Sequence, residues 1–475
     1  MRIDLKRVIV GRPLPADDHE AQRLTKAAGL AVFGPDAVSN TAFGAETLLR
    51  VLVPVAAMAA LSYVVPLTVA ILVMLAFLGL SYAQMINAYP RGGGTYAVCG
   101  RQMGSLAAEV AGSALLVDYT LTVTVSVAVA TRTTTSAVTG LRGRETLICV
   151  GLIWILAVIN LRGIRESKRV AMVPAYTYVA VVAGLVVWGL LRSASGGLGR
   201  LPVDQAQLRA ATDGGRLVTG VTAVYVLRAF AAGTVALSGV EAISNGVPTF
   251  EQPRRRNARI TLAWTLGLLG STLLGVAILT ARLRPTLSTT ETVLSTLGAA
   301  VFGRNSMLYI LLQAATMLIL LFAANTGFSD FPRITAVIAG DGRLPRPLAD
   351  RGERQVFSKA ILLAAGLSSG LVLGFGSDVE VLASLWAVAL LLTFTMSQLG
   401  MAAHHVRERK RGWRVSIAVN ALGATATTLS LGVLMVTTFG DGAWLLAIAV
   451  PTLVLTFRAF ARRSREPDDN LTTAR

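Results

Sequence analysis

ALSGVEAISNGVP, residues 236–248, places a single carboxylate, that of Glu241, inside an otherwise apolar stretch. A second stretch, AVFGPDAVSNTAFGAE at residues 31–46, places Asp36 among small and apolar residues and ends with Glu46. An acid in the middle of a membrane span is costly in lipid and normally faces the inside of a helix bundle. We therefore expect both stretches to be membrane helices whose acids meet at membrane depth.

The same two stretches contain residues that interrupt helices, and we predict breaks at Gly34, Pro35 and Gly239. Glycine tolerates backbone conformations that other residues avoid, and proline removes a helical hydrogen bond. Unwound backbone is tolerated inside a membrane only where it is buried in protein or lines a cavity. Broken helices in the two halves of a chain point to the binding site of a secondary transporter.

The composition indicates an integral membrane protein. Hydrophobic residues make up 53% of the 475 positions, charged residues make up 15%, and the mean hydropathy is +0.62. About twelve apolar runs are long enough to cross a bilayer as helices. They lie at residues 28–53, 63–88, 104–137, 144–161, 170–192, 222–248, 258–283, 306–338, 358–374, 379–402, 414–436 and 441–460. The segment at 54–62 is the least regular.

The net charge of +18 is explained by membrane topology, because the basic residues gather in the loops and tails expected on one side of the membrane. With both termini inside, about 31 of the 44 Lys and Arg residues fall in the tails and in the inside loops, as the positive-inside rule requires. Residues 1–27 are then a cytoplasmic tail without the features of a signal peptide, and residues 461–475 are a second tail. We expect a multi-pass protein of the plasma membrane, and no nucleic-acid partner.

Several chemistries have no residues to carry them. The chain has two cysteines, Cys99 and Cys149, without metal-binding spacing, and none of its three histidines falls in the middle of a predicted span. A membrane enzyme would need a nucleophile with its base or a cluster of metal ligands. We therefore expect no enzyme, no cofactor and no resident metal.

The third predicted span carries a polar stripe. Asp118, Thr122 and Ser126 recur at i, i+4 and i+8, and Tyr119 lies beside them. Thr and Ser in membrane helices often only return a hydrogen bond to a carbonyl of the previous turn. The aspartate on the same face favours a functional role for the stripe. Arg132, near the end of this span, could extend toward the outer membrane interface or pair with an acid, and its place near the helix end favours the interface.

Together these features resemble the APC superfamily of permeases, and within it the KimA-type branch of potassium/proton symporters. The resemblance runs in order from about residue 14 to the tenth span. The strings that carry it are AVFGPDAVSNTAFGAE, YPRGGGTYAVCGRQMG, ALLVDYTLTVTVSVA, NLRGIRES, RAFAAGTVALSGVEAISNGVPTFEQPRRRNAR and NTGFSDFPRITAVIAGDGRLPR. The sixth-span and eighth-span strings are the most specific of these.

The resemblance implies an all-α, LeuT-like core of five plus five helices in inverted repeats at residues 28–402. Two peripheral helices at residues 403–460 would follow. It also implies alternating access around the broken first and sixth spans. Carried over residue by residue, the substrate or cation site would consist of Asp36, Asp118, Tyr119, Thr122, Ser126, Ser238 and Glu241.

The chain departs from the branch pattern at two aromatic positions. Phe43 and Trp386 stand where that pattern has tyrosines, so two hydroxyls that could close a gate or bind a cation are absent. Either ring could instead stack on an ammonium group. A proton-coupled permease for an amino acid or an amine therefore stays open beside cation uptake.

The residues themselves favour a cation. A dehydrated monovalent cation needs several oxygen ligands, which carboxylates, hydroxyls and free carbonyls provide. A substrate carboxylate prefers free amides, yet Pro35 lacks one and Asp36 adds a negative charge. The expected partners are a small solute or cation such as potassium, protons and the bilayer, with Glu241 as the candidate for proton coupling. A homodimer is left open.

Overall fold

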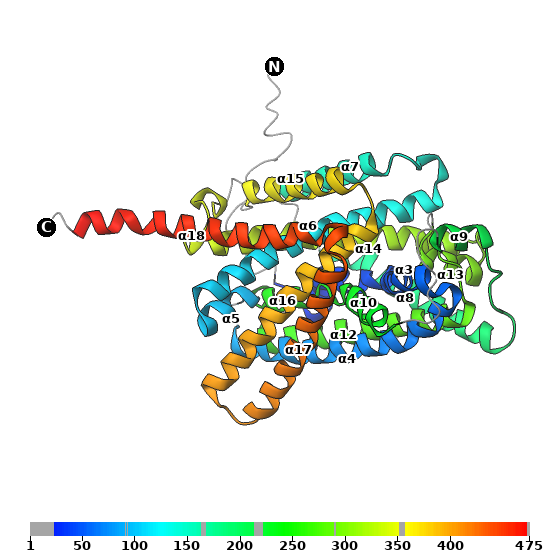
Figure 1. Cartoon of the computed structure of the whole chain (residues 1–475), viewed down its shortest axis with the longest axis horizontal. Coiled ribbons are helices and arrows are strands. Elements are labelled where there is room, and N and C mark those ends of the chain that lie inside the picture. Colours follow the sequence, from blue (N-terminus) through cyan, green and yellow to red (C-terminus); the bar gives the residue numbers. More distant parts are fainter. Residues whose placement is uncertain are drawn as a thin grey trace, which may run out of the picture.

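The protein folds into a bundle of long helices (Figure 1). The computed structural model describes residues 23–90, 92, 94–162, 168–212, 222–288, 291–350 and 357–472. Within these ranges every named element is a helix, and the one strand-like pairing is an isolated bridge between Leu24 and Phe250. The all-α class predicted from the apolar runs is confirmed.

The helices follow the predicted spans closely. Short connecting helices are α5 (Gly94–Met103), α9 (Gln205–Thr212) and α13 (Val293–Phe302). The others are α2 (Lys26–Ser39), α3 (Gly44–Ala56), α4 (Leu61–Ala88), α6 (Ser105–Ala137), α7 (Glu145–Leu161), α8 (Lys168–Ala194), α10 (Ala223–Gly233), α11 (Val240–Asn245), α12 (Arg254–Leu283), α14 (Met307–Gly340), α15 (Ser358–Phe375), α16 (Val379–Glu408), α17 (Trp413–Thr437) and α18 (Trp444–Thr472).

Ten stretches in the described part of the chain are long and apolar enough to cross a membrane. The first, Lys26–Ala88, is 63 residues long and holds two predicted spans, separated by the turn at Ala57–Ala60. The apolar helix α7 has 17 residues, just short of the usual length. With these two observations the predicted spans are all accounted for.

The third span forms the centre of the bundle. The apolar window of α6 is 94% buried, and its main neighbours are α14 and α16. The windows of α17 and α18 are only 33% and 22% buried, and their outward side chains are apolar. An apolar outer face is what a lipid environment requires. The last two helices are thus peripheral, and the polar stripe of α6 is central.

The break in the first span lies later in the chain than predicted. Helix α2 continues through Gly34 and Pro35, because a proline removes one hydrogen bond but leaves a helix intact where neighbouring helices support it. The interruption comes later, in the 3-10 turn η2 (Asn40–Ala42) and at Phe43, whose φ of −133° and ψ of −3° are not helical. Asp36 consequently lies in the last turn of α2, just before the break.

The sixth span breaks where the sequence predicted. Helix α10 passes into the 3-10 turn η5 (Thr234–Leu237), and Ser238 then adopts an extended conformation. Gly239 has a φ of +79°, in the left-handed region that favours glycine, and α11 begins directly after it. The predicted role of Gly239 as a helix break is confirmed.

The two ends of the chain differ in what can be described. Most of the predicted tail at residues 1–27 lies outside the described residues. At the other end, α18 continues through the predicted boundary at 460 to Thr472 and projects from the bundle (Figure 1). A helix can continue into polar sequence once it leaves the apolar layer, so hydropathy alone placed its end too early.

Candidate functional site

The two broken spans touch each other at their breaks. The Ser238 hydroxyl donates a hydrogen bond of 3.1 Å to Oδ1 of the buried Asp36. Asn40 Nδ2 donates to the Ser238 hydroxyl at 3.0 Å and to the Ala236 carbonyl at 3.3 Å. A Cβ on Gly239 would lie 2.8 Å from Asp36 Cβ. Only glycine permits this approach, which positions Asp36 against the second break.

Two residues of the predicted stripe on α6 contact the sixth span or the residues around it: Asp118 interacts with Glu241, and Tyr119 with Asn245. Asp118, Tyr119, Thr122 and Ser126 are all buried. The Thr122 hydroxyl donates to the carbonyl of Asp118 at 2.9 Å. This is the ordinary return bond of a membrane threonine. This bond uses the hydroxyl proton, so the hydroxyl oxygen can still accept a hydrogen bond or contact a cation.

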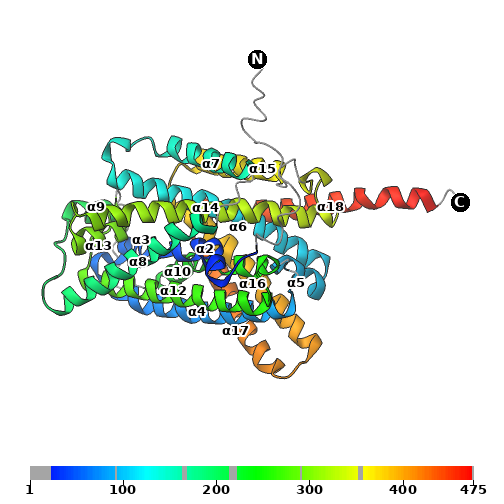
Figure 2. The ribbon, with the colours of Figure 1, turned by 180° about the vertical axis from the view of Figure 1, so that it is seen from behind.

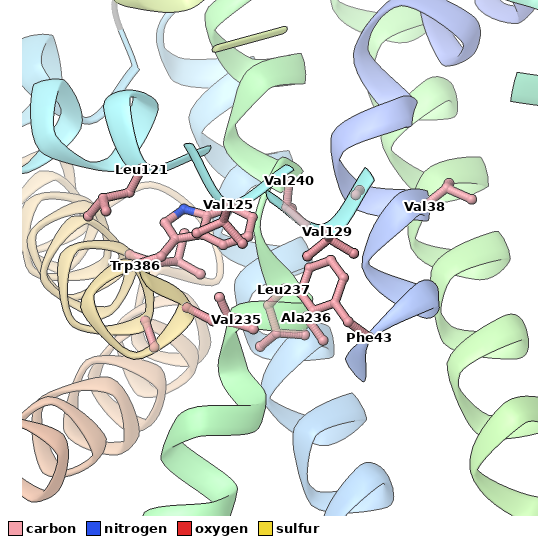
Figure 3. Packing of buried hydrophobic residues seen from close by; sticks show 14 of the residues in the cluster. Val38, Phe43, Leu121, Val125, Val129, Val235, Ala236, Leu237, Val240 and Trp386 are labelled. Atoms are coloured by element: carbon pink, nitrogen blue, oxygen red, sulfur yellow. The ribbon is translucent and has the colours of Figure 1, made fainter. Parts of the chain in front are cut away.

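Trp386 of α16 binds the aspartate of this stripe. Its indole Nε1 donates a hydrogen bond of 2.8 Å to Asp118 Oδ1. The Trp386 and Phe43 rings lie 6.3 Å apart between centroids, at an angle of 39°. Figure 3 shows both rings among buried apolar side chains of α6 and of the sixth span. The two positions that depart from the branch pattern are therefore neighbours and form an apolar wall beside the acids.

Several buried oxygens at this junction have no hydrogen-bond partner among the described residues. These atoms are Asp118 Oδ2, Glu241 Oε2, Asp330 Oδ2 and Asn40 Oδ1. A buried polar atom without a partner is costly, and a carboxylate oxygen more so. Such atoms are explained where a cation, a proton or water takes the free position.

Four carboxyl groups are close enough to interact electrostatically. The carboxyl group of Glu241 interacts electrostatically with those of Asp118, Asp36 and Asp330, and all four side chains are buried. Like charges in a low dielectric repel strongly. Arg333 offsets one of them, since its Nη1 lies 3.1 Å from Asp330 Oδ1. The remaining acids require compensation by protons or by a bound cation.

Three residues at this centre were missed by the sequence reasoning. Asn40 links the two breaks, as described above, and Asn245 Nδ2 donates to the Tyr119 hydroxyl at 2.8 Å. Asp330 lies in the specific eighth-span string NTGFSDFPR, where it is a buried acid in an apolar helix. The rule that singled out Asp36 and Glu241 would have found Asp330 as well. The two asparagines carry no charge and gave no such signal.

Beyond the first break lies a second charged group, which we call the arginine–glutamate cluster and define as Glu46, Arg50, Arg132 and Glu380. Glu46 Oε1 accepts from Arg50 Nη2 at 2.8 Å and lies 3.2 Å from Arg132 Nη1. Arg50 also pairs with Glu380. Both arginines donate to the carbonyl of Ser288, at 3.0 and 3.2 Å.

This cluster corrects the expectation for Arg132 and joins separate parts of the fold. Instead of extending to the interface, Arg132 is 15% exposed and paired with Glu46. The cluster connects α3, α6 and α16 with the segment that leads into α13. At the first residue of α13, the Val293 amide donates to Glu46 Oε2 at 3.0 Å. A cavity of about 420 Å³ lined by Arg132 and Glu380 lies next to it. The junction of the breaks is thus covered on this side by ion pairs.

Comparison with known proteins identifies the family of this chain. A family model described as amino acid permease matches residues 37–457. The chain belongs to the amino acid permease family. This permease is 38% identical over 455 residues to the potassium transporter KimA of Bacillus subtilis (strain 168). The match covers 96% of the permease and 73% of KimA.

Membership of the family has direct consequences. The permease is a multi-pass membrane transporter and not an enzyme. Its buried acids are accordingly interpreted as parts of a transport path, since a catalytic centre would need a nucleophile and its base.

Proposed function

We propose that this permease takes up a monovalent cation such as potassium, coupled to protons, by alternating access. Two features support the cation: the similarity to the potassium transporter KimA and the oxygen-rich junction of the broken spans. In this proposal Asp36, Asp118 and Glu241 supply carboxylates, and hydroxyls complete the set of ligands. Those hydroxyls belong to Tyr119, Thr122, Ser126 and Ser238.

The observation that carries the proposal is that the buried carboxyls of Asp118 and Glu241 lie together, with no N–H or O–H of the described chain donating to Asp118 Oδ2 or Glu241 Oε2. Each belongs to a buried carboxyl group that interacts with the other and with Asp36. A cation among the three acids would use the free oxygens and reduce the repulsion at the same time. A substrate carboxylate would increase that repulsion.

Glu241 is the candidate for proton coupling. It is the second residue of α11, two positions after Gly239, so its backbone moves with the second break. If a proton on Glu241 and a cation on the neighbouring acids each lower the repulsion, binding of one changes the affinity for the other. A proton gradient could then drive accumulation of the cation.

Alternating access would move the broken spans relative to α6. Residues 28–402 would form the transport core, and residues 403–460 would form the peripheral pair. The arginine–glutamate cluster would hold the extracellular side closed, with both termini in the cytoplasm. The distribution of Lys and Arg supports this orientation in the plasma membrane.

One observation favours a second candidate, an organic amine. Phe43 and Trp386 are buried beside Asp118, and an ammonium group binds both carboxylates and aromatic faces. An amine permease would use the same acids with the rings as the selective element. For an amine, the rings of Phe43 and Trp386 would contact the substrate, whereas for a cation they would only line the site.

Uptake into proteoliposomes tests the proposal. Labelled rubidium, as a potassium analogue, should accumulate when the outside is acidic and should do so less without a pH gradient. Asp36→Asn and Glu241→Gln should remain folded and lose uptake. Asp350→Asn, a change of an exposed acid outside the junction, should transport as the parent does.

The same experiment contains the results that would refute it. Wild-type rates for both site variants would remove the site assignment. Uptake of labelled amines or amino acids without rubidium would replace the cation by the second candidate.

A further inference from the structure

A long apolar groove runs along the outside of the bundle between α4 and α12. It has a volume of about 1010 Å³. Figures 1 and 2 both draw these helices side by side along one edge, and the two helices are in contact. The groove is separate from the junction of the breaks and is not needed for the proposed transport of a cation.

The groove exists because small residues line it at helical spacing. On α4 it follows Ala76 and Ala83, and on α12 it follows Ala263 and Gly267, while Leu266 of α12 packs onto Gly79 between them. Residues three or four apart share one face of a helix, so each series forms a shallow channel. From residue 72 to 87 the channel is about 22 Å long. This length exceeds the roughly 15 Å of hydrocarbon in one leaflet.

One end of the groove is strongly basic. Arg255, Arg256 and Arg259 line it at the start of α12, with Asn87 opposite them on α4. All three arginines are exposed, and they make no ion pair with any acid in the described part of the chain. The rest of the lining is apolar apart from Asn87. The groove therefore combines a basic end, not paired with acids of the described residues, with an apolar channel.

We propose that this groove binds a phospholipid with an anionic headgroup. The arginines bind the phosphate, because guanidinium groups form charge-assisted hydrogen bonds with phosphate oxygens. One acyl chain lies along the small residues of α4 and α12. Basic sites between membrane helices are suited to such headgroups. The charge complementarity selects this occupant over a neutral lipid or a second copy of the chain.

The position of the lipid connects it to the broken sixth span. Helix α11 packs against both α4 and α12, and eight residues separate the end of α11 from the start of α12. A lipid bound at Arg255 and Arg259 would bridge α4 and α12 and restrain the two helices that flank α11.

Lipid retention by the purified permease tests the proposal. The protein is equilibrated in detergent with phosphatidylglycerol or phosphatidylcholine, and bound lipid is counted by native mass spectrometry. The wild type should retain phosphatidylglycerol in preference to phosphatidylcholine. The triple variant R255Q/R256Q/R259Q should bind phosphatidylglycerol about 100-fold more weakly, as three lost arginine contacts predict. The control R407Q/R411Q/R414Q removes the same charge elsewhere and should bind normally.

A second variant tests the channel itself. A Cβ on Gly267 meets no atom within 4 Å, so the side chain of Gly267→Phe can start into the groove that Gly267 lines. It should retain at least tenfold less phosphatidylglycerol. Gly374→Phe, at an exposed glycine of α15 that is equally unobstructed, should behave as the wild type.

Four results would overturn the proposal. The first is equal retention of the two lipids by the wild type. The second is undiminished retention in either groove variant, and the third is thermal protection by inorganic phosphate equal to that by phosphatidylglycerol. The fourth is a lipid-free dimer that Gly267→Phe dissociates, which would assign the groove to a second copy of the chain.

Discussion

Glu46→Gln should shift this permease toward the state that is open to the extracellular side. The Glu46 carboxylate is shared by Arg50 and Arg132, whose side chains are 13% and 15% exposed. Removing one member of a buried ion pair costs about 3–5 kcal/mol, and partial exposure with the remaining Arg50–Glu380 pair places the cost at the lower end. A cost of about 3 kcal/mol changes the ratio of closed to open molecules roughly 100-fold.

A cysteine reporter measures this shift. Val129 is buried one turn before Arg132 on α6, near Phe43 (Figure 3). Cys99 and Cys149 are buried and would be replaced by alanine, so that Val129→Cys supplies the single reactive thiol. In right-side-out vesicles, a membrane-impermeant maleimide should label this thiol about 100-fold faster when Glu46→Gln is present.

A matched control separates gating from a general effect of losing an acid. Glu291 pairs with Arg304 at 2.8 Å, but Arg304 is 56% exposed and the pair lies outside the cluster. An exposed pair contributes little to stability. Glu291→Gln should leave the labelling rate unchanged. Equal rates in the parent and in Glu46→Gln would refute the view that the cluster keeps the extracellular side closed.

Three further changes give distinct outcomes. Gly239→Ala should abolish transport and destabilise the protein by about 1–3 kcal/mol in thermal unfolding, because its backbone is left-handed and its Cβ would clash, whereas Gly267→Ala should be neutral. Trp386→Phe removes the donor to Asp118 and should raise the KM for rubidium about tenfold in uptake assays; an unchanged KM would show that this bond does not support the ionised carboxylate. Glu109→Gln breaks a buried contact with two arginines, one of them half exposed, and should lower stability by about 1–2 kcal/mol without changing rubidium selectivity.

The fold was largely predictable because hydropathy reports membrane spans directly. The length of an apolar run and the cost of unpaired backbone in lipid leave helices as the outcome for such a sequence. Gly239 was placed correctly, since a left-handed residue between two helical turns requires glycine. Gly34 and Pro35 misled for a physical reason. Whether a proline ends a helix depends on the packing of neighbouring helices, which the local sequence does not predict.

The candidate site was predictable only in part. Buried acids such as Asp36 and Asp118 stand out against an apolar background, and the same criterion would have singled out Asp330. The hydrogen bonds of Asn40 and Trp386 could not be read in this way. They join residues about 200 and 270 positions apart, and such pairings depend on how helices rotate against each other.

The close contact between Gly239 and Asp36 joins the two interrupted spans at their breaks. Because no side chain separates them, neither can swing away without disturbing the other. The bond from Ser238 makes the arrangement of one half sensitive to what the carboxylate of the other half is holding. The occupied and the empty site would thus favour different orientations of both spans together. The two spans would then move as one rigid body, and states open to both sides of the membrane at once would be rare.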